Sequence, residues 1–201
     1  EEEIDVEVSS VIVATGWRPY DATNLDTLGF GTFPNVITNV MMERYAATGG
    51  PTGGRIVRPS DGEAPSRVAF VQCAGSRDVN HLNYCSGVCC LASLKQATYV
   101  KEQLPDAEVT MYYIDRRAPG RNEDTLTPVS ALDGVELVNG KVGKIEQEGG
   151  ALKLRVEDIH SGKMLDATAD LVVLATGMVS RLSEASSPFG LKQDEDGFGL
   201  D

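Results

Sequence analysis

Residues 67–115 decide the fold, and they read RVAFVQCAGSRDVNHLNYCSGVCCLASLKQATYVKEQLPDAEVTMYYID. The run at 67–73 is almost continuously apolar, which is typical of a strand buried on both faces. Apolar residues then recur at helical spacing over 86–104, and Pro105 ends that helix. A second apolar run follows at 107–115. Strand, helix and strand within about fifty residues predict a βαβ unit with parallel strands.

Two further segments resemble each other, because 9–16 (SSVIVATG) and 169–177 (ADLVVLATG) are apolar runs that end in Ala-Thr-Gly. Each predicts a buried strand of a parallel sheet. A short helix is predicted over 38–48, with Thr38 or Asn39 as its cap. Four short strands are predicted after the βαβ unit, at 135–138, 141–147, 151–157 and 164–168. Because Asn139-Gly140, Gly149-Gly150 and Ser161-Gly162 separate them, these strands predict an antiparallel meander.

Composition narrows the class of protein. The 201 residues are 41% hydrophobic and 24% charged, which is usual for a globular domain. The formal net charge of −12 argues against nucleic acid as a partner, since a phosphate backbone requires a basic face. No apolar run is long enough to span a bilayer and no secretion signal opens the chain, so we expect a cytoplasmic protein without direct membrane insertion. Because the sequence lacks an initiator Met, we interpret it as a fragment of a longer polypeptide.

The four cysteines, Cys73, Cys85, Cys89 and Cys90, have the spacing C-x11-C-x3-C-C. A disulfide framework belongs to small secreted chains, which this is not. Structural zinc sites usually have two C-x2–4-C knuckles, and here there is no second one. Neighbouring side chains on a helix diverge by about 100°, which suits a [4Fe–4S] cluster better than one ion, because each iron takes a separate thiolate. The cluster is therefore favoured, with zinc and free or redox-active thiols as alternatives.

The position of these cysteines is also informative. Cys89 and Cys90 fall in the first turn of the predicted helix, where the helix dipole favours thiolate. A nucleotide-binding βαβ unit would carry G-x-G-x-x-G at this junction, whereas residues 72–78 read QCAGSRD and the cysteine loop follows. Metal ligands thus take the place of the pyrophosphate cradle. Within this loop, Arg77 and Asp78 are expected to form a local ion pair.

Three stretches resemble the A subunit of heterodisulfide reductase and that of its relative, the quinone-interacting membrane-bound oxidoreductase of sulfate reducers. They are 71–78 (VQCAGSRD), 84–91 (YCSGVCCL) and 94–97 (LKQA). The similarity extends through Ile114-Asp115, Ala118-Pro119-Gly120 and residues 175–179. Of these two subunits, the quinone-linked one is favoured by the amino-acid sequence at 74–82 and 118–124.

This resemblance implies an α/β fold of the thioredoxin-reductase-like flavoprotein type, a Rossmann-like FAD/NAD(P)-binding architecture with a parallel sheet and an antiparallel β-meander. It implies that Cys73, Cys85, Cys89 and Cys90 hold a [4Fe–4S] cluster and that Gly16 and Gly177 lie close to FAD. The family's N-terminal G-x-G-x-x-G segment is absent from this chain, so FAD is expected in the full-length protein and not in this chain alone.

The resemblance also implies an oxidoreductase subunit that relays electrons between FAD and other redox subunits in anaerobic sulfur or methanogenic energy metabolism, with any membrane association made through those partners. The expected division is 1–62, the end of the FAD domain and a linker; 63–180, the cysteine-bearing βαβ unit and meander; and 181–201, the return to the FAD domain. Two alternatives remain: a non-catalytic docking module with structural zinc, and a pyridine-nucleotide-dependent disulfide reductase domain.

Overall fold

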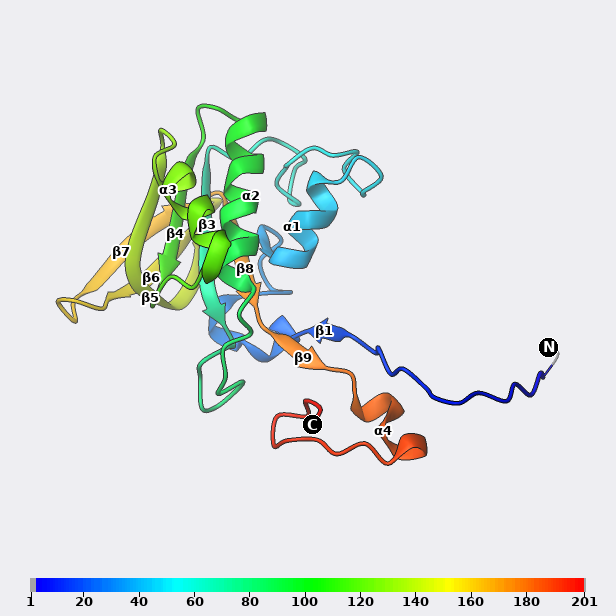
Figure 1. The fold of residues 1–201 in the computed structure, drawn as a ribbon. Helices are drawn as coiled ribbons and strands as arrows, with labels where there is room; N and C mark the ends of the chain where they lie inside the picture. Colours follow the sequence, from blue (N-terminus) through cyan, green and yellow to red (C-terminus); the bar gives the residue numbers. More distant parts are fainter. Residues whose placement is uncertain (1–2, 201) are drawn as a thin grey trace. The chain divides into compact units, whose positions relative to one another are not determined.

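A computed structural model describes residues 3–200, which fall into two units (Figure 1). The smaller unit comprises the residues up to Pro19 and those from Met178 onward. In it, β1 (Trp17–Pro19) pairs antiparallel with β9 (Met178–Ser180), and helix α4 (Ser183–Phe189) follows. The larger unit, Tyr20–Gly177, carries the sheet and all four cysteines. The three-part division expected from the sequence stays a prediction.

The larger unit is built on a seven-stranded sheet in the order β2-β8-β3-β4-β5-β6-β7. The first five strands are parallel neighbours, and β5, β6 and β7 then pair antiparallel as a meander. The predicted βαβ unit and the mixed α/β sheet are therefore confirmed. The strands are β2 (Val36–Thr38), β3 (Arg67–Ala74), β4 (Glu108–Tyr113), β5 (Val135–Glu148), β6 (Ala151–Asp158), β7 (Met164–Ala169) and β8 (Leu171–Thr176).

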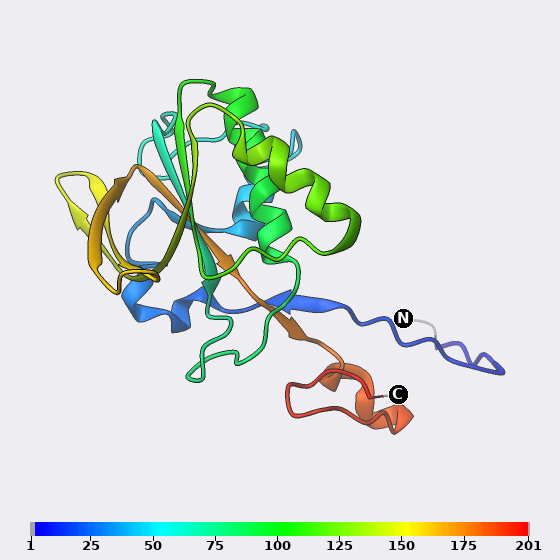
Figure 2. The ribbon, with the colours of Figure 1, turned by 60° about the vertical axis from the view of Figure 1, so that its left-hand side comes forward.

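Three helices cover one face of this sheet, as Figures 1 and 2 show. They are α1 (Asn39–Ala46), α2 (Cys89–Gln103) and α3 (Glu123–Ser130). Phe70 of β3 and Leu94 of α2 are buried in the core between helices and sheet. The opposite face packs with the meander and with the short 3-10 helices η1 (Ala22–Asn24) and η2 (Asp26–Leu28). A third 3-10 helix, η3 (Gly120–Asn122), precedes α3.

Local signals explain where several of these elements begin. The Thr38 hydroxyl accepts a hydrogen bond from the Met41 amide at 3.3 Å, so the predicted cap of α1 is confirmed. The strand β8 is buried at every position, as its continuous apolar run predicts. No helix within residues 3–200 is long and apolar enough to cross a membrane.

Two predicted elements differ from the structure. Residues 9–16 form no strand, and Ile12 is 91% exposed, so the buried strand predicted there is wrong. An apolar run becomes a strand only where a neighbour completes its hydrogen bonds, and no strand within residues 3–200 pairs with this segment. The predicted turn at Asn139-Gly140 is also wrong, because β5 continues through both residues.

Asp170 fixes the start of the two central strands. Its carboxylate accepts hydrogen bonds from the backbone amides of Ser66 and Arg67, at 3.1 and 2.9 Å, and from the Arg67 guanidinium at 2.8 Å. Burial alone raises the pKa of Asp170, but the hydrogen bonds and charge of Arg67 outweigh it and hold the pKa below its ordinary value. The ionised carboxylate therefore stabilises the folded state.

We expect Asp170→Asn to lower the free energy of unfolding by about 1 kcal/mol at pH 7, a value reduced because Arg67 is partly exposed. A depressed pKa contributes stability above the unfolded pKa, about 3.9 for Asp, and that contribution disappears as pH falls through the folded pKa. Urea unfolding at pH 7 and near pH 3 measures both quantities. Asp166→Asn is the control, since Asp166 is 56% exposed in its pair with Lys153. Equal losses in both variants would contradict the assignment.

Candidate metal centre

Cys73 is the next-to-last residue of β3, at an irregularity in the strand. The pairing of β3 with β8 shifts register between Val71 and Ala74, and Cys73 has a φ of +55°. A non-glycine residue in this left-handed region is strained, and such strain is found mainly where a side chain must be held in a particular direction. The register shift and the positive φ turn Cys73 out of the in-and-out alternation of the strand.

Cys89 and Cys90 begin α2, as predicted. Val88 is at the N-cap position of the helix and makes no side-chain cap. The backbone amides of the first turn therefore donate no hydrogen bond to a capping side chain. The Cys89 thiol donates to the Thr176 carbonyl at 3.5 Å, and the Cys90 thiol donates to the Asp115 carbonyl at 3.9 Å. These two contacts anchor the start of α2 to the ends of β8 and β4.

The loop between Cys73 and Cys89 is folded back on itself. The Arg77 amide donates to the Tyr84 carbonyl at 3.1 Å, and the Leu82 amide donates to the Gly75 carbonyl at 2.9 Å. Gly177 lies directly against this loop: a Cβ atom placed on it would be 2.2 Å from Ser76 Oγ and 2.8 Å from Ser86 Oγ. The glycine that ends the second Ala-Thr-Gly motif therefore permits close approach of the cysteine loop.

All four cysteines line one small cavity, together with Ser76, Ser86, Gly87, Val88, Asp115 and Arg117. The cysteines are not disulfide-bonded. Among residues 3–200, no group of three or more His, Cys, Asp or Glu side chains is close enough to hold a metal ion. The thiols thus surround a space and do not converge on one point.

Burial raises the pKa of Cys73, Cys89 and Cys90, and the neighbouring thiols raise it further; for Cys89 it reaches about 12. Desolvation is the largest effect on the pKa of Cys89 and Cys90, so it outweighs the influence expected of the helix terminus. Cations that bind here must displace protons, so binding weakens as pH falls.

Two arginines approach the thiols. Arg77 pairs with Asp115 and not with Asp78, so the predicted local pair is wrong; Asp78 instead pairs with Lys141 at 3.5 Å. Arg117 pairs with the same Asp115 carboxylate at 3.1 Å. Sequence reasoning overlooked Asp115 and Arg117, although a signal existed. They follow β4, and residues after the carboxyl ends of adjacent parallel strands meet at one edge of the sheet.

Polar groups without partners also gather near the cysteines. The buried side chains of Gln72, on β3, and Ser76, in the loop, have no hydrogen-bond partner among the described residues. Gln72 shares a small cavity with Cys90, and Ser76 lines the cysteine cavity. Buried polar groups in folded proteins are nearly always hydrogen-bonded, so these side chains are candidates for contact with a ligand at the cysteine site.

Comparison with known proteins shows which family the chain resembles. No protein-family model matches the sequence. The chain is 44% identical over 178 residues, 88% of its length, to the A subunit of the ferredoxin/F(420)H(2)-dependent CoB-CoM heterodisulfide reductase of Methanosarcina acetivorans. It is 37% identical over 204 residues, 98% of its length, to the second iron-sulfur A subunit of the CoB--CoM heterodisulfide reductase of Methanopyrus kandleri. Over nearly its whole length this chain is similar to a part of the heterodisulfide reductase A subunits, the family predicted from its sequence.

The family sequences are much longer, and the chain spans 22% and 31% of these two relatives. Among solved structures, the thioredoxin reductase of T. acidophilum matches with a TM-score of 0.54 at 16% identity, over 92% of this chain and 50% of that one. At that identity the likeness concerns the fold alone. It confirms the thioredoxin-reductase-like α/β class predicted for this chain.

The two glycines predicted to lie near FAD fall in different units. Gly177 ends the larger unit and contacts the cysteine loop, whereas Gly16 precedes β1 in the smaller unit, with a φ of +67°. Their proximity to a flavin stays a prediction.

Proposed function

We propose that this chain is the cysteine-cluster domain of a flavin and iron–sulfur electron-transfer subunit. In this proposal Cys73, Cys85, Cys89 and Cys90 hold a [4Fe–4S] cluster. The observation that carries it is the enclosure of one cavity by four thiols from a strand end, a loop and a helix start. The name of the Methanopyrus kandleri relative, which describes it as an iron-sulfur protein, agrees with it.

The arrangement of thiols favours a cluster over zinc. A structural zinc ion takes four thiolates at about 2.3 Å from one point, whereas no such convergent group exists among the described residues. A [4Fe–4S] cluster takes its thiolates at separate corners, which four thiols around a cavity can supply. Ser76, whose buried hydroxyl lines the same cavity, would be a candidate hydrogen-bond donor to such a cluster.

A [4Fe–4S] cluster supplies one-electron transfer when bound. The chain's own residues provide the rest of the site. The thiols release their protons on binding, while the Cys73 turn and the start of α2 hold their positions. The partners in the intact protein are FAD and the other redox subunits of a heterodisulfide-reductase-like or quinone-interacting complex. The relatives are named as heterodisulfide reductase subunits. The quinone-linked subunit is favoured only by the amino-acid sequence at 74–82 and 118–124.

The test is anaerobic reconstitution of the full-length protein with iron and sulfide. We expect about four iron and four sulfide per cysteine site above those of a variant lacking all four cysteines, with a broad visible absorption that bleaches on reduction. Stoichiometric zinc without iron uptake at this site overturns the proposal in favour of the structural-zinc alternative. Saturable nicotinamide binding that requires residues 72–78 would instead support a pyridine-nucleotide-dependent reductase.

A further inference from the structure

One carboxylate lies between two guanidinium groups at the edge of the cysteine cavity. Asp115 Oδ1 pairs with Arg77, and Asp115 Oδ2 accepts from Arg117 Nη2 at 3.1 Å and from Arg117 Nε at 3.2 Å. We call these three residues the arginine clamp. Its formal charge is +1, within a chain whose formal net charge is −12. The site is thus a local exception to the charge of the whole chain.

The clamp borders the cysteine cavity. Asp115 and Arg117 line the cavity with all four cysteines, and the Asp115 carbonyl accepts from the Cys90 thiol at 3.9 Å. Arg117 also lines a neighbouring pocket together with Cys85, and Arg77 is held at the site by its pair with Asp115. Arg117 therefore contacts the shared carboxylate and the wall of the cysteine cavity, and Arg77 adjoins the cavity through Asp115.

The backbone of Arg77 has a strained conformation. Its φ is +57°, in the left-handed region that only glycine adopts freely, and it shares this feature with Cys73 alone among the described non-glycine residues. An exposed arginine with no task would not require such a conformation. The strain is localised in Cys73, one of the proposed ligands, and in Arg77, which pairs with Asp115 at the edge of the cysteine cavity.

We propose that Arg77 and Arg117 are positioning residues that raise the reduction potential of the cluster, and that Asp115 opposes them; this inference rests on the function proposed above. Reduction adds one electron to a site that is already anionic. Positive charge beside the ligand sulfurs favours the reduced form, because it attracts the added electron. Arginine suits this role because it keeps its charge at every working pH.

A purely structural role for the clamp makes a different prediction. If the three residues only closed the loop, Arg117→Gln and Asp115→Asn would both loosen the site and would not shift the potential in opposite directions. If charge is what matters, removing a cation lowers the potential and removing the anion raises it. The sign of the Asp115→Asn shift separates the two roles.

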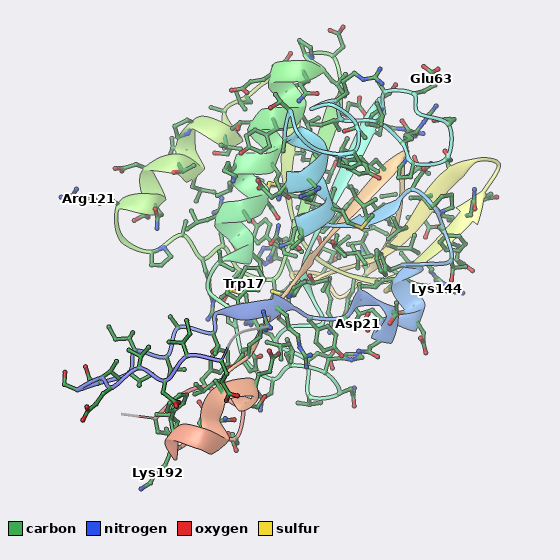
Figure 3. All side chains as sticks on the ribbon, turned by 90° about the vertical axis from the view of Figure 1, so that its right-hand side faces the viewer. Trp17, Asp21, Glu63, Arg121, Lys144 and Lys192 are labelled. Carbon is green, nitrogen blue, oxygen red and sulfur yellow. The ribbon has the colours of Figure 1, made fainter. Side chains whose placement is uncertain are left out.

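The experiment is a potentiometric titration of the reconstituted full-length protein with dithionite as the electron donor, followed by the electron paramagnetic resonance signal of this cluster. At the parent's midpoint potential, we expect Arg117→Gln to lower the ratio of reduced to oxidised cluster about tenfold, which is 59 mV for one electron. Asp115→Asn should raise that ratio. Arg121→Gln is the matched control, because Figure 3 shows that side chain projecting away from the helices.

Iron and sulfide are measured in every sample, which keeps the two proposals separable. A parent protein without this cluster overturns the proposed function, whatever the variants do. A parent that holds the cluster, with unchanged midpoints or with shifts of the same sign in Arg117→Gln and Asp115→Asn, overturns the role of the clamp alone. Where Arg117→Gln fails to hold the cluster, Asp115→Asn decides, since it retains both arginines.

Discussion

Cys89→Ser is expected to reduce the iron held at this site from about four atoms per chain to less than about one, while the chain stays folded. Serine is a shorter and harder ligand, and its hydroxyl does not ionise at neutral pH. The fold survives because the serine hydroxyl can donate to the Thr176 carbonyl, as the thiol now does. In addition, the two hydrophobic clusters of the sheet do not include Cys89.

Iron and sulfide analysis, circular dichroism and urea unfolding of the same samples check this result. Ala92→Ser is the matched control, because it places a hydroxyl in the same helix without removing a thiol, and it should keep the iron. Loss of fold in Cys89→Ser indicates a structural metal site, since metal binding and folding are then coupled. Full iron content in a folded Cys89→Ser chain removes Cys89 from the ligand set.

The parallel part of the sheet could be predicted because its strands are buried on both faces. The runs that became β3 and β8 are apolar almost throughout, and such runs have few alternatives to a central parallel strand. The run at 9–16 is also mainly apolar, yet it forms no strand. Residue pattern indicates what a segment can bury, but the neighbour that completes its hydrogen bonds has to be present as well.

The turn predicted at Asn139-Gly140 failed for a long-range reason. The Asn139 side-chain amide donates to the carbonyls of Tyr113 and Ile114 at 3.1 and 2.8 Å, where β4 ends. Gly140 lies so close to β6 that a Cβ atom would be 2.7 Å from Val156 Cγ1. Both residues therefore serve close contacts between neighbouring strands. A sequence pattern that is typical of hairpins cannot reveal contacts made across the sheet.

The four cysteines of the candidate site were predicted together because their spacing is unusual for any other use. The backbone conformation and the ion pairs around these cysteines were not predicted. The left-handed backbone of Cys73 and Arg77 leaves no trace in residue type, since neither is glycine or asparagine. The pairing of Arg77 with Asp115 joins residues 38 positions apart, whereas sequence reasoning selected the adjacent Asp78. Charge partners chosen by proximity in sequence are unreliable where loops from neighbouring strands meet.

Gly177→Ala is expected to destabilise the larger unit by about 1 to 3 kcal/mol and to lower iron incorporation. The added methyl group would be 2.2 Å from Ser76 Oγ and 3.0 Å from Leu82 Cδ1, so the cysteine loop has to move away from the end of β8. That movement displaces the segment holding Cys85 relative to Cys89, whose thiol contacts the adjacent Thr176 carbonyl. Urea unfolding and iron analysis measure the two effects.

Two further variants test whether steric contact is the cause. Ser76→Ala removes the hydroxyl nearest to the new methyl group, so in the Gly177→Ala background it should restore part of the stability. Gly143→Ala is the control, because a Cβ atom there meets nothing within 4 Å. If Gly177 matters only through a flavin, Gly177→Ala lowers FAD occupancy of the full-length protein and leaves the stability of the flavin-free chain unchanged. Lost stability in the flavin-free chain, recovered by Ser76→Ala, assigns Gly177 instead to the packing of the cysteine loop.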